Sequence, residues 1–418
     1  MVTSNIYHRS QSKKDSVLYR PQPRHDIREH QLRRFIEEKF GVKIDSYSAF
    51  HRWSCENYAK FWEALLIFTG IKLGSSYDTV VDTSMRITDF PRWFSGATLN
   101  YTENCLRGKD EDCLSIYSTS FSNSGIKPAD VICGFLPNSY QTSVAMFATA
   151  AIGATWCSVS VDFGPCGAVD RFKQVNPKVL FTVEAVTYKG KTHDLTEKLN
   201  LIVPGIPSLA KVVQINNLNS TIDFNKYQHG EKYESFDCIL NSVKCVPHPF
   251  VFEKVPFSHP LFVMFSSGTT GIPKAMIHTT GVLYYVVYFF FWKINVIVKG
   301  TLLKHVEEHL IQANSQSCDR MLFYTTCGWM MWNWVMSFLF CGGSIVLFDQ
   351  SPLEPDPHII LKVTSVSKAT IIGMGAKMYD EYAKMNVDFR KFYKSIRSDN
   401  FDDPAVLNAS LISLYCWG

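Results

Sequence analysis

The chain has 418 residues, of which 46% are hydrophobic, 14% aromatic and 19% charged. This composition excludes a disordered, collagen-like or low-complexity protein, and the length predicts two or more domains or one elaborate α/β unit. The formal net charge is only +4, so binding of nucleic acid would need a local basic patch. The one candidate, residues 20–34, is interrupted by Asp26 and Glu29. We therefore expect no nucleic-acid partner.

The twelve cysteines form no CxxC motif, and most lie in apolar runs such as 131–133. We expect buried, reduced thiols in a cytosolic protein rather than a disulfide framework. The N-terminal residues form no apolar signal segment, so secretion is not expected. The apolar segment Leu283–Val298 contains Lys293 and is shorter than the roughly 20 apolar residues that a membrane span needs. We expect no stable membrane insertion, with a transmembrane helix as the lesser alternative.

Residues 1–40 are polar and charged and predict a loosely ordered arm that ends in a helix over Gln31–Phe40. The following segment, 41–106, is rich in aromatic residues and is expected to form a subdomain of its own. Its apolar residues recur at helical spacing, which predicts a helix that packs an aromatic face on the main body: Trp53, Tyr58, Phe61, Trp62 and Leu65.

From Cys113 onward, short apolar runs alternate with helical stretches, while residues 217–256 read as polar and irregular. The predicted strands are Cys113–Tyr117, Val131–Leu136, Thr155–Val159, Val179–Val183, Val212–Ile215 and Leu261–Phe265. The predicted helices are Gln141–Ile152, Asp170–Val175 and Asp194–Leu199. This alternation predicts an α/β fold with a mostly parallel, doubly wound sheet. Ligands of such sheets bind beyond the carboxyl ends of the strands.

The last of these strands runs into a loop rich in glycine and hydroxyl residues that ends in a lysine. Glycines allow a backbone to approach a phosphate, successive N–H groups and hydroxyls bind its oxygens, and a lysine neutralises its charge. The loop therefore predicts a polyphosphate site, with a flexible surface turn as the alternative. The candidate binding residues are Ser266, Ser267, Gly268, Thr269, Thr270, Gly271 and Lys274. It is not a Walker A loop, because GxxxxGK[ST] is absent.

Further motifs accompany this loop. They are Trp93-Phe94 with Leu99-Asn100-Tyr101, Leu136-Pro137-Asn138, Ser160–Gly164 with Asp170-Arg171-Phe172, Val183-Glu184-Ala185 with Tyr188–Lys191, and Tyr324–Trp334 (YTTCGWMMWNW). Together they resemble the acyl-adenylate-forming synthetases over most of residues 41–386, and the last motif is similar to the acetoacetyl-CoA synthetase branch. The resemblance implies the large N-terminal domain of that fold. It divides the chain into an arm (1–40), an N-terminal subdomain (41–106), an incomplete AMP-binding domain (107–390) and a divergent tail (391–418).

The resemblance also implies a reaction and its site. Acetoacetate, ATP and CoA would give acetoacetyl-CoA, AMP and pyrophosphate through an acyl-adenylate, with Mg²⁺, in ketone body and lipid metabolism. Trp329, Trp332 and Asn333 would line the acid pocket, and Asn333 would donate to the ketone, with core packing as the alternative for the tryptophans. Lys189, Gly190 and Lys191 resemble a basic loop near the CoA phosphates, although a solvated turn also fits.

The sequence departs from this family at its C-terminal end. After residues 373–377 the family has adenine- and ribose-binding motifs and a small lid domain with a catalytic lysine. None of these precedes Gly418, and the resemblance ends near Lys391. The sequence therefore offers no candidate for the catalytic residue, and an inactive chain is one expectation. The alternatives are a non-catalytic nucleotide- or acyl-binding remnant of the family and a ligase for another short acid such as acetate.

Two internal segments also depart. Residues 118–124 leave little room for a crossover helix, which predicts a poorly formed or re-routed first strand pair. Removing Val282–Lys299 restores a family-like sequence, and its composition fits a translated AT-rich intron, so we hypothesise a retained short intron. His305 and His309 lack the glutamate of a zinc helix and predict an ordinary helix face rather than a metal site.

Overall fold

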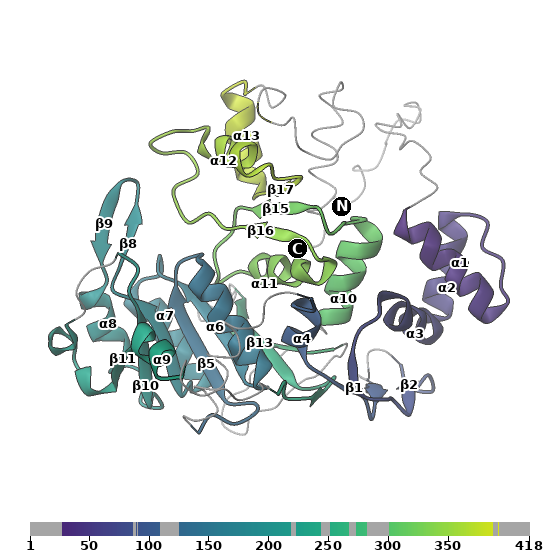
Figure 1. The fold of residues 1–418 in the computed structure, drawn as a ribbon, viewed down its shortest axis with the longest axis horizontal. Coiled ribbons are helices and arrows are strands. Elements are labelled where there is room, and N and C mark those ends of the chain that lie inside the picture. Colours follow the sequence, from purple (N-terminus) through teal and green to yellow (C-terminus); the bar gives the residue numbers. More distant parts are fainter. Residues whose placement is uncertain are drawn as a thin grey trace, which may run out of the picture.

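A computed structural model describes residues 27–86, 89, 91–108, 125–218, 223–243, 251–266, 273–281, 301–387 and 392 (Figure 1). Five segments with sequence-based predictions lie outside these residues: most of the N-terminal arm, the strand Cys113–Tyr117 with its connection 118–124, the loop residues 267–272, the segment 282–299, and the tail from 393.

Three helices form the N-terminal subdomain beside the main body (Figure 1). They are α1 (Arg28–Phe40), α2 (Tyr47–Glu56) and α3 (Tyr58–Thr69). The single aromatic helix expected here is two helices, because the chain leaves helical geometry at Asn57. The aromatic side chains do pack together, with ring centroids of Phe61 and Trp62 5.3 Å apart and those of Trp62 and Trp93 6.5 Å apart. Short strands and a helix follow: β1 (Leu73–Ser75), β2 (Thr79–Val81), β3 (Trp93–Ser95), β4 (Thr98–Leu99) and α4 (Tyr101–Cys105).

The main body is built on a seven-stranded sheet of order β11-β10-β7-β5-β6-β13-β14. Every neighbouring pair is parallel except β13 with β14, which confirms the mostly parallel fold. The strands are β5 (Val131–Leu136), β6 (Thr155–Ser160), β7 (Val179–Val183), β10 (Lys211–Ile215), β11 (Tyr233–Ser235), β13 (Pro260–Ser266) and β14 (Lys274–Thr279). Both edges of β5 are paired, with β6 and β7, while the predicted strand Cys113–Tyr117 lies outside the described residues.

Helices connect these strands: α6 (Tyr140–Ala151), α7 (Pro165–Val175), α8 (Thr196–Ile202) and α9 (Phe236–Val243). Two predictions need correction. The helix expected over Asp194–Leu199 begins at Thr196, because Asp194 ends a hairpin strand. Residues 217–256 are not irregular throughout: they include η2 (Phe224–Lys226), η3 (Gly230–Lys232), β11, α9 and β12 (Val255–Pro256). Strands of two or three residues are too short to show an alternating pattern, and this hid them in the sequence.

A smaller parallel sheet of order β16-β15-β17 lies above the large one in Figure 1. It consists of β15 (Arg320–Phe323), β16 (Ser344–Val346) and β17 (Ile371–Gly373), with α12 (Ile359–Ser367) and α13 (Ala376–Lys384). In Figure 1, α11 (Met330–Ser337) lies between the sheets with α10 (Leu302–Val306) beside it. The π-helical turn η4 (Glu307–Gln312) continues α10, and η5 (Phe338–Cys341) continues α11. A hairpin of β8 (Ala185–Tyr188) and β9 (Lys191–Asp194) projects from the large sheet.

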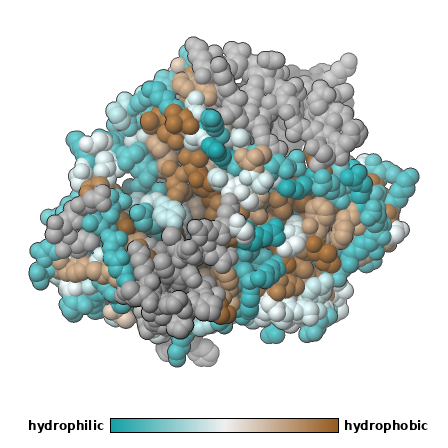
Figure 2. All heavy atoms as spheres, viewed as in Figure 1, coloured by the Kyte–Doolittle hydropathy of each residue, from teal (hydrophilic) through white to brown (hydrophobic). Residues whose placement is uncertain are grey.

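One hydrophobic core joins the N-terminal helices, the large sheet and α11, and a second, smaller core lies under α12 and α13. Figure 2 shows apolar side chains gathered around α12 and towards the junction of the two sheets. Nine free cysteines lie in the described residues, and five of them are buried, as predicted; Cys55, Cys166, Cys238 and Cys318 are exposed, which the sequence did not predict. No helix in the described ranges is long and apolar enough to span a membrane, and Leu283–Val298 lies outside them.

Candidate active site

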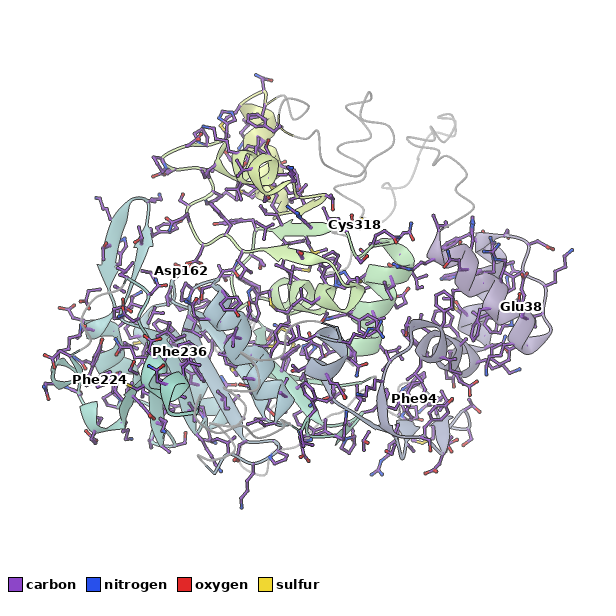
Figure 3. The ribbon with its side chains drawn as sticks, in the orientation of Figure 1. Glu38, Phe94, Asp162, Phe224, Phe236 and Cys318 are labelled. Atoms are coloured by element: carbon purple, nitrogen blue, oxygen red, sulfur yellow. The ribbon has the colours of Figure 1, made fainter. Side chains whose placement is uncertain are left out.

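The carboxyl ends of strands from both sheets meet at one place. Asn138 follows β5 and Asp162 follows β6 in the large sheet, and Asp349 follows β16 in the small one. In Figure 3, Asp162 lies at the end of the large sheet that faces the small sheet. Parallel α/β sheets bind ligands at such ends, so this junction is the candidate active site.

Asn138 links the large sheet to the small sheet and to α11 through its backbone N–H and both polar atoms of its side chain. Its backbone N–H donates to Oδ1 of Asp349 at 2.7 Å. Its Nδ2 donates to the carbonyls of Thr325 and Phe348, both at 3.2 Å, and its Oδ1 accepts from Nε1 of Trp332 at 2.8 Å. Because Asn138 is buried, each of these bonds forms away from water, and the loss of one would leave a buried group unsatisfied.

The Cys327-Gly328 part of the YTTCGWMMWNW motif rests on the large sheet. The carbonyl of Cys327 accepts from Oγ of Ser158 at 2.5 Å, and its thiol donates to the carbonyl of Leu136 at 3.1 Å. A side chain at Gly328 would place its Cβ 3.3 Å from the backbone nitrogen of Ser160. Glycine at this position therefore lets the motif approach the end of β6 closely.

The three predicted acid-pocket residues have different surroundings. Trp329 is 58% exposed, whereas Trp332 is 1% exposed and donates to Asn138. Asn333 is 3% exposed, and its Nδ2 lies 3.3 Å from Sδ of Met264 on β13. In the described part of the chain, Oδ1 of Asn333 has no hydrogen-bond partner. The structure thus places Asn333 beside β13, the strand that leads into the predicted phosphate loop; contact of the three residues with an acid stays a prediction.

The predicted phosphate loop connects two antiparallel strands. Ser266 at the end of β13 and Lys274 at the start of β14 are cross-strand partners, while residues 267–272 lie outside the described ranges. The side chain of Lys274 is exposed, and none of the described carboxylates forms an ion pair with it. An exposed cation at this position is available to an anion, but phosphate binding by Ser266–Lys274 stays a prediction.

Helix α7 holds both strands at the base of this loop. Nε2 of Gln174 donates to the carbonyl of Pro273 at 2.9 Å, and Oε1 accepts from the backbone N–H of Ala275 at 3.3 Å. One turn earlier, the guanidinium of Arg171 lies 4.4 Å from the ring of Phe163 and 5.8 Å from the ring of Phe265. Arg171 lies in the motif Asp170-Arg171-Phe172, but no sequence pattern predicts a role for Gln174.

Two carboxylates and two tyrosines line a small cavity of about 30 Å³ between the sheets: Asp162, Asp349, Tyr188 and Tyr324. Burial raises the pKa of Asp349 to about 6, against the hydrogen bond from Asn138, and the charge of Asp162 raises it further. Burial also raises the pKa of Tyr324 to about 12. The sequence analysis contained Asp162 only within the motif Ser160–Gly164 and did not predict its pairing with Asp349, although the two residues come two and three positions after β6 and β16.

The basic loop predicted for CoA is the turn of the β8–β9 hairpin. Lys189 and Gly190 have φ values of 50° and 72°, as a two-residue turn of mirror-image type requires. Nζ of Lys189 pairs with Oε1 of Glu354 at 2.8 Å, and this hydrogen bond raises the pKa of Lys189. Lys191 is exposed. CoA contact by Lys189, Gly190 and Lys191 stays a prediction.

The histidines of α10 and η4 do not form an ordinary helix face. Nδ1 of His305 lies 2.7 Å from Oγ of Ser337, which also contacts the hydroxyl of Tyr101 at 2.7 Å. His309 is buried against the carbonyl of Trp334 at 2.9 Å, and burial lowers its pKa to about 4. The pattern misled because α10 continues as a buried π-helical turn. Within the described ranges, no group of three or more metal-ligating side chains is present.

Comparisons with known proteins agree with this architecture. A family model described as AMP-binding enzyme matches residues 114–402, and one described as acetyl-coenzyme A synthetase N-terminus matches residues 47–105. The chain belongs to the AMP-binding enzyme family. This confirms the family and the fold predicted from the motifs, while the four domain boundaries stay predictions.

Relatives of this AMP-binding enzyme are named acetoacetyl-CoA synthetase. The chain is 48% identical over 401 residues to the protein of Caenorhabditis elegans, covering 90% of this chain and 55% of that protein. It is 31% identical to the protein of Rhizobium meliloti (strain 1021), covering 83% and 53%. The solved acetoacetyl-CoA synthetase from Streptomyces lividans matches with a TM-score of 0.76 at 30% identity, covering 89% of this chain and 57% of that one. The chain thus spans about half the length of the curated relatives it matches.

Proposed function

We propose that this AMP-binding enzyme is an ATP-dependent acid–CoA ligase whose acid is acetoacetate. The contact between Asn333 and Met264 is the observation that carries the proposal. It places a buried carboxamide from the branch-specific motif beside the strand that leads into the predicted phosphate loop. An acid held near Asn333 would have its carboxylate close to a nucleotide phosphate held at Ser266–Lys274.

The proposed reaction has two steps. An acetoacetate oxygen attacks the α-phosphorus of ATP, the bond to the β-phosphate oxygen breaks, and pyrophosphate leaves. The sulfur of CoA then attacks the acyl carbon of the acyl-adenylate, the thiol proton is lost, and AMP leaves with the oxygen. Phosphoryl transfer depends mainly on positioning and charge neutralisation. Lys274 would supply one positive charge, and Mg²⁺ would enter bound to the phosphates of ATP.

Asn333 would recognise the ketone of the acid. Its Oδ1 is buried without a partner among the described residues, and its Nδ2 contacts only a sulfur and a carbonyl at 3.5 Å. A bound ketone would give the amide a stronger hydrogen bond than the thioether does. Acetate lacks the ketone, so a site that uses Asn333 in this way should prefer acetoacetate to acetate.

CoA would approach from the side of the β8–β9 hairpin. Lys191 is exposed there, and the cavity lined by Asp162 and Asp349 opens beside Tyr188. The nine free cysteines of the described residues support a reducing compartment, and we place the protein in the cytosol.

The test separates binding from catalysis. ATP with Mg²⁺ is titrated into the purified chain by calorimetry, and pyrophosphate release is measured with acetoacetate or acetate present. The proposal expects ATP binding, and pyrophosphate release that is faster with acetoacetate and slowed by Asn333→Ala. ATP and acetoacetate binding without pyrophosphate release would instead support the non-catalytic binding protein. Absence of ATP binding by the folded chain would contradict both.

A further inference from the structure

Strand β14 is the last strand of the large sheet in the described chain, and its outer side meets a helix instead of another strand. On that side, the Pro273 carbonyl and the Ala275 N–H flank Lys274. Both groups bond to the carboxamide of Gln174, at 2.9 Å and 3.3 Å. The backbone on both sides of Lys274 is therefore fixed by a single side chain.

A carboxamide suits this position because it offers one donor and one acceptor to a backbone that presents one acceptor and one donor. Gln174 thus bonds to β14 much as a neighbouring strand would. The side chain is itself held, because its Nε2 also donates to the carbonyl of Asp170 at 2.8 Å. Arg171 lies on the same face of α7 and contacts Phe265, the cross-strand partner of Ala275.

We propose that Gln174 is a positioning residue for Lys274, and so for the polyphosphate that Lys274 binds. Polyphosphate binding by Lys274 depends on the proposed function, whereas the positioning of Lys274 by Gln174 depends only on the hydrogen bonds. Gln174 does not contact the phosphate itself. It fixes the peptide groups at 273 and 275, which sets the direction in which the Lys274 side chain leaves the strand.

Gln174→Met tests the proposal, because methionine has a similar length but offers no strong donor or acceptor. Gln316→Met is the matched control, since Nε2 of Gln316 donates to the carbonyl of Asn314 at 2.8 Å before β15. Hydrogen exchange of the Ala275 amide reports positioning, and calorimetry with ATP and Mg²⁺ reports binding. Both are measured for the full chain and again in the background of Lys274→Ala.

We expect Gln174→Met to accelerate exchange at Ala275. It should also weaken ATP binding about tenfold, because a displaced Lys274 side chain loses about one hydrogen bond to the charged phosphate. In the Lys274→Ala background it should cause no further loss, and Gln316→Met should change neither quantity. Unchanged exchange at Ala275, or an equal loss of affinity with and without Lys274, would overturn the proposal. If the unaltered chain binds no ATP, the proposed function fails, while exchange at Ala275 still decides whether Gln174 positions the backbone.

A second, independent observation concerns the other end of β14. The N–H of Thr301 donates to the carbonyl of Thr279 at 3.0 Å, and the N–H of Leu302 donates to the carbonyl of Thr280 at 3.1 Å. Each pair is 22 positions apart in the chain. Without the 18 residues 282–299, each pair would be four positions apart, which is the spacing of α-helical hydrogen bonds.

We infer that residues 282–299 are an insertion into the first turn of α10. The bonds from Thr301 and Leu302 then have α-helical spacing directly after β14, and the bond from His305 to Thr301 already has this spacing in the full chain. The incoming chain is fixed on its own side, because Gly281 donates to the carbonyl of Phe257 at 3.0 Å. The retained-intron hypothesis explains how such an insertion arose, whereas the spacing of the hydrogen-bonded pairs is a property of the folded chain.

Two deletions test this inference. Removing 282–299 restores the spacing of four, whereas removing 282–298 leaves a spacing of five. We expect the 18-residue deletion to raise the thermal midpoint by about 2–4 °C relative to the full chain. The 17-residue deletion should have a lower midpoint than the 18-residue deletion. A midpoint of the 18-residue deletion below that of the full chain, or equal midpoints for the two deletions, would overturn the inference.

Discussion

The two ends of β14 are held in different ways. Before the strand, side chains of α7 hold the backbone around Lys274. After it, backbone bonds from Thr301 and Leu302 close on Thr279 and Thr280 with the register of a helix. The first end exposes a cation beside the strand ends where ligands bind, and the second lies in the core. Changes at the first end should therefore alter ligand binding, and changes at the second should alter stability.

The largest expected effect is on stability at the second end. A Cβ at Gly281 would lie 1.9 Å from Cδ1 of Phe257, so Gly281→Ala should lower the free energy of unfolding by about 3 kcal/mol. Gly375 has no heavy atom within 4 Å of such a Cβ, and Gly375→Ala should change little. Urea unfolding measures both variants. The comparison fails if Gly281→Ala is as stable as its control.

At the first end, Lys274→Ala should weaken binding of ATP with Mg²⁺ about 30-fold, or about 2 kcal/mol, because a charge-assisted contact to phosphate is lost. Its unfolding midpoint should not change, since the side chain is exposed. Calorimetry and thermal unfolding measure the two quantities. Lys178→Ala, at the amino end of β7, is the control lysine and should leave ATP affinity unchanged. A stability loss without loss of affinity would reverse the assignment of the two ends.

Acid should act on stability through His309, which lies in η4 beyond α10 and belongs to neither end of β14. Burial lowers its folded-state pKa to about 4, below the usual 6.5 or so of an unfolded histidine. The unfolded chain therefore binds the proton first, and stability falls as the pH drops below about 6.5 towards 4. Between pH 7 and pH 5 the protein should lose about 1–2 kcal/mol more than His309→Gln loses. Parallel pH profiles for the two proteins would show that His309 is not the titrating group.

The smallest effect is expected at Asp349, which belongs to neither end of β14. Its folded-state pKa of about 6 lies above the unfolded value near 3.8, so the ionised carboxylate lowers stability at pH 7 and this cost shrinks as the pH falls through 6. Asp349→Asn should be about 1 kcal/mol more stable at pH 7, with a smaller gain at pH 5. A gain that does not depend on pH would point to packing instead of charge.

The strands of the large sheet could be predicted from the sequence because they are buried on both faces. Val131–Leu136 and Val179–Val183 consist mainly of apolar residues, and their predicted bounds are those of β5 and β7. Strand β13 could be predicted for the same reason, because Leu261–Phe265 is an apolar run that leads into the glycine- and hydroxyl-rich loop.

Long-range partners could not be predicted in this way. The sequence indicates Asn138 only as part of the motif Leu136-Pro137-Asn138. In the structure it bonds to Thr325, Trp332 and Asp349. Gln174 reads as an ordinary helix residue until β14 is placed beside it. The His305–Ser337–Tyr101 contacts join three elements that no local pattern brings together.

The most direct test of the account is a titration of the folded chain with ATP and Mg²⁺, followed by the backbone amide signals of Lys274 and Ala275. We predict that the amide signals of residues 274 and 275 both shift and saturate, and that Lys274→Ala needs about 30-fold more ATP for the same saturation. Signals that stay fixed through the titration, while the rest of the spectrum is that of a folded protein, would contradict polyphosphate binding at this loop.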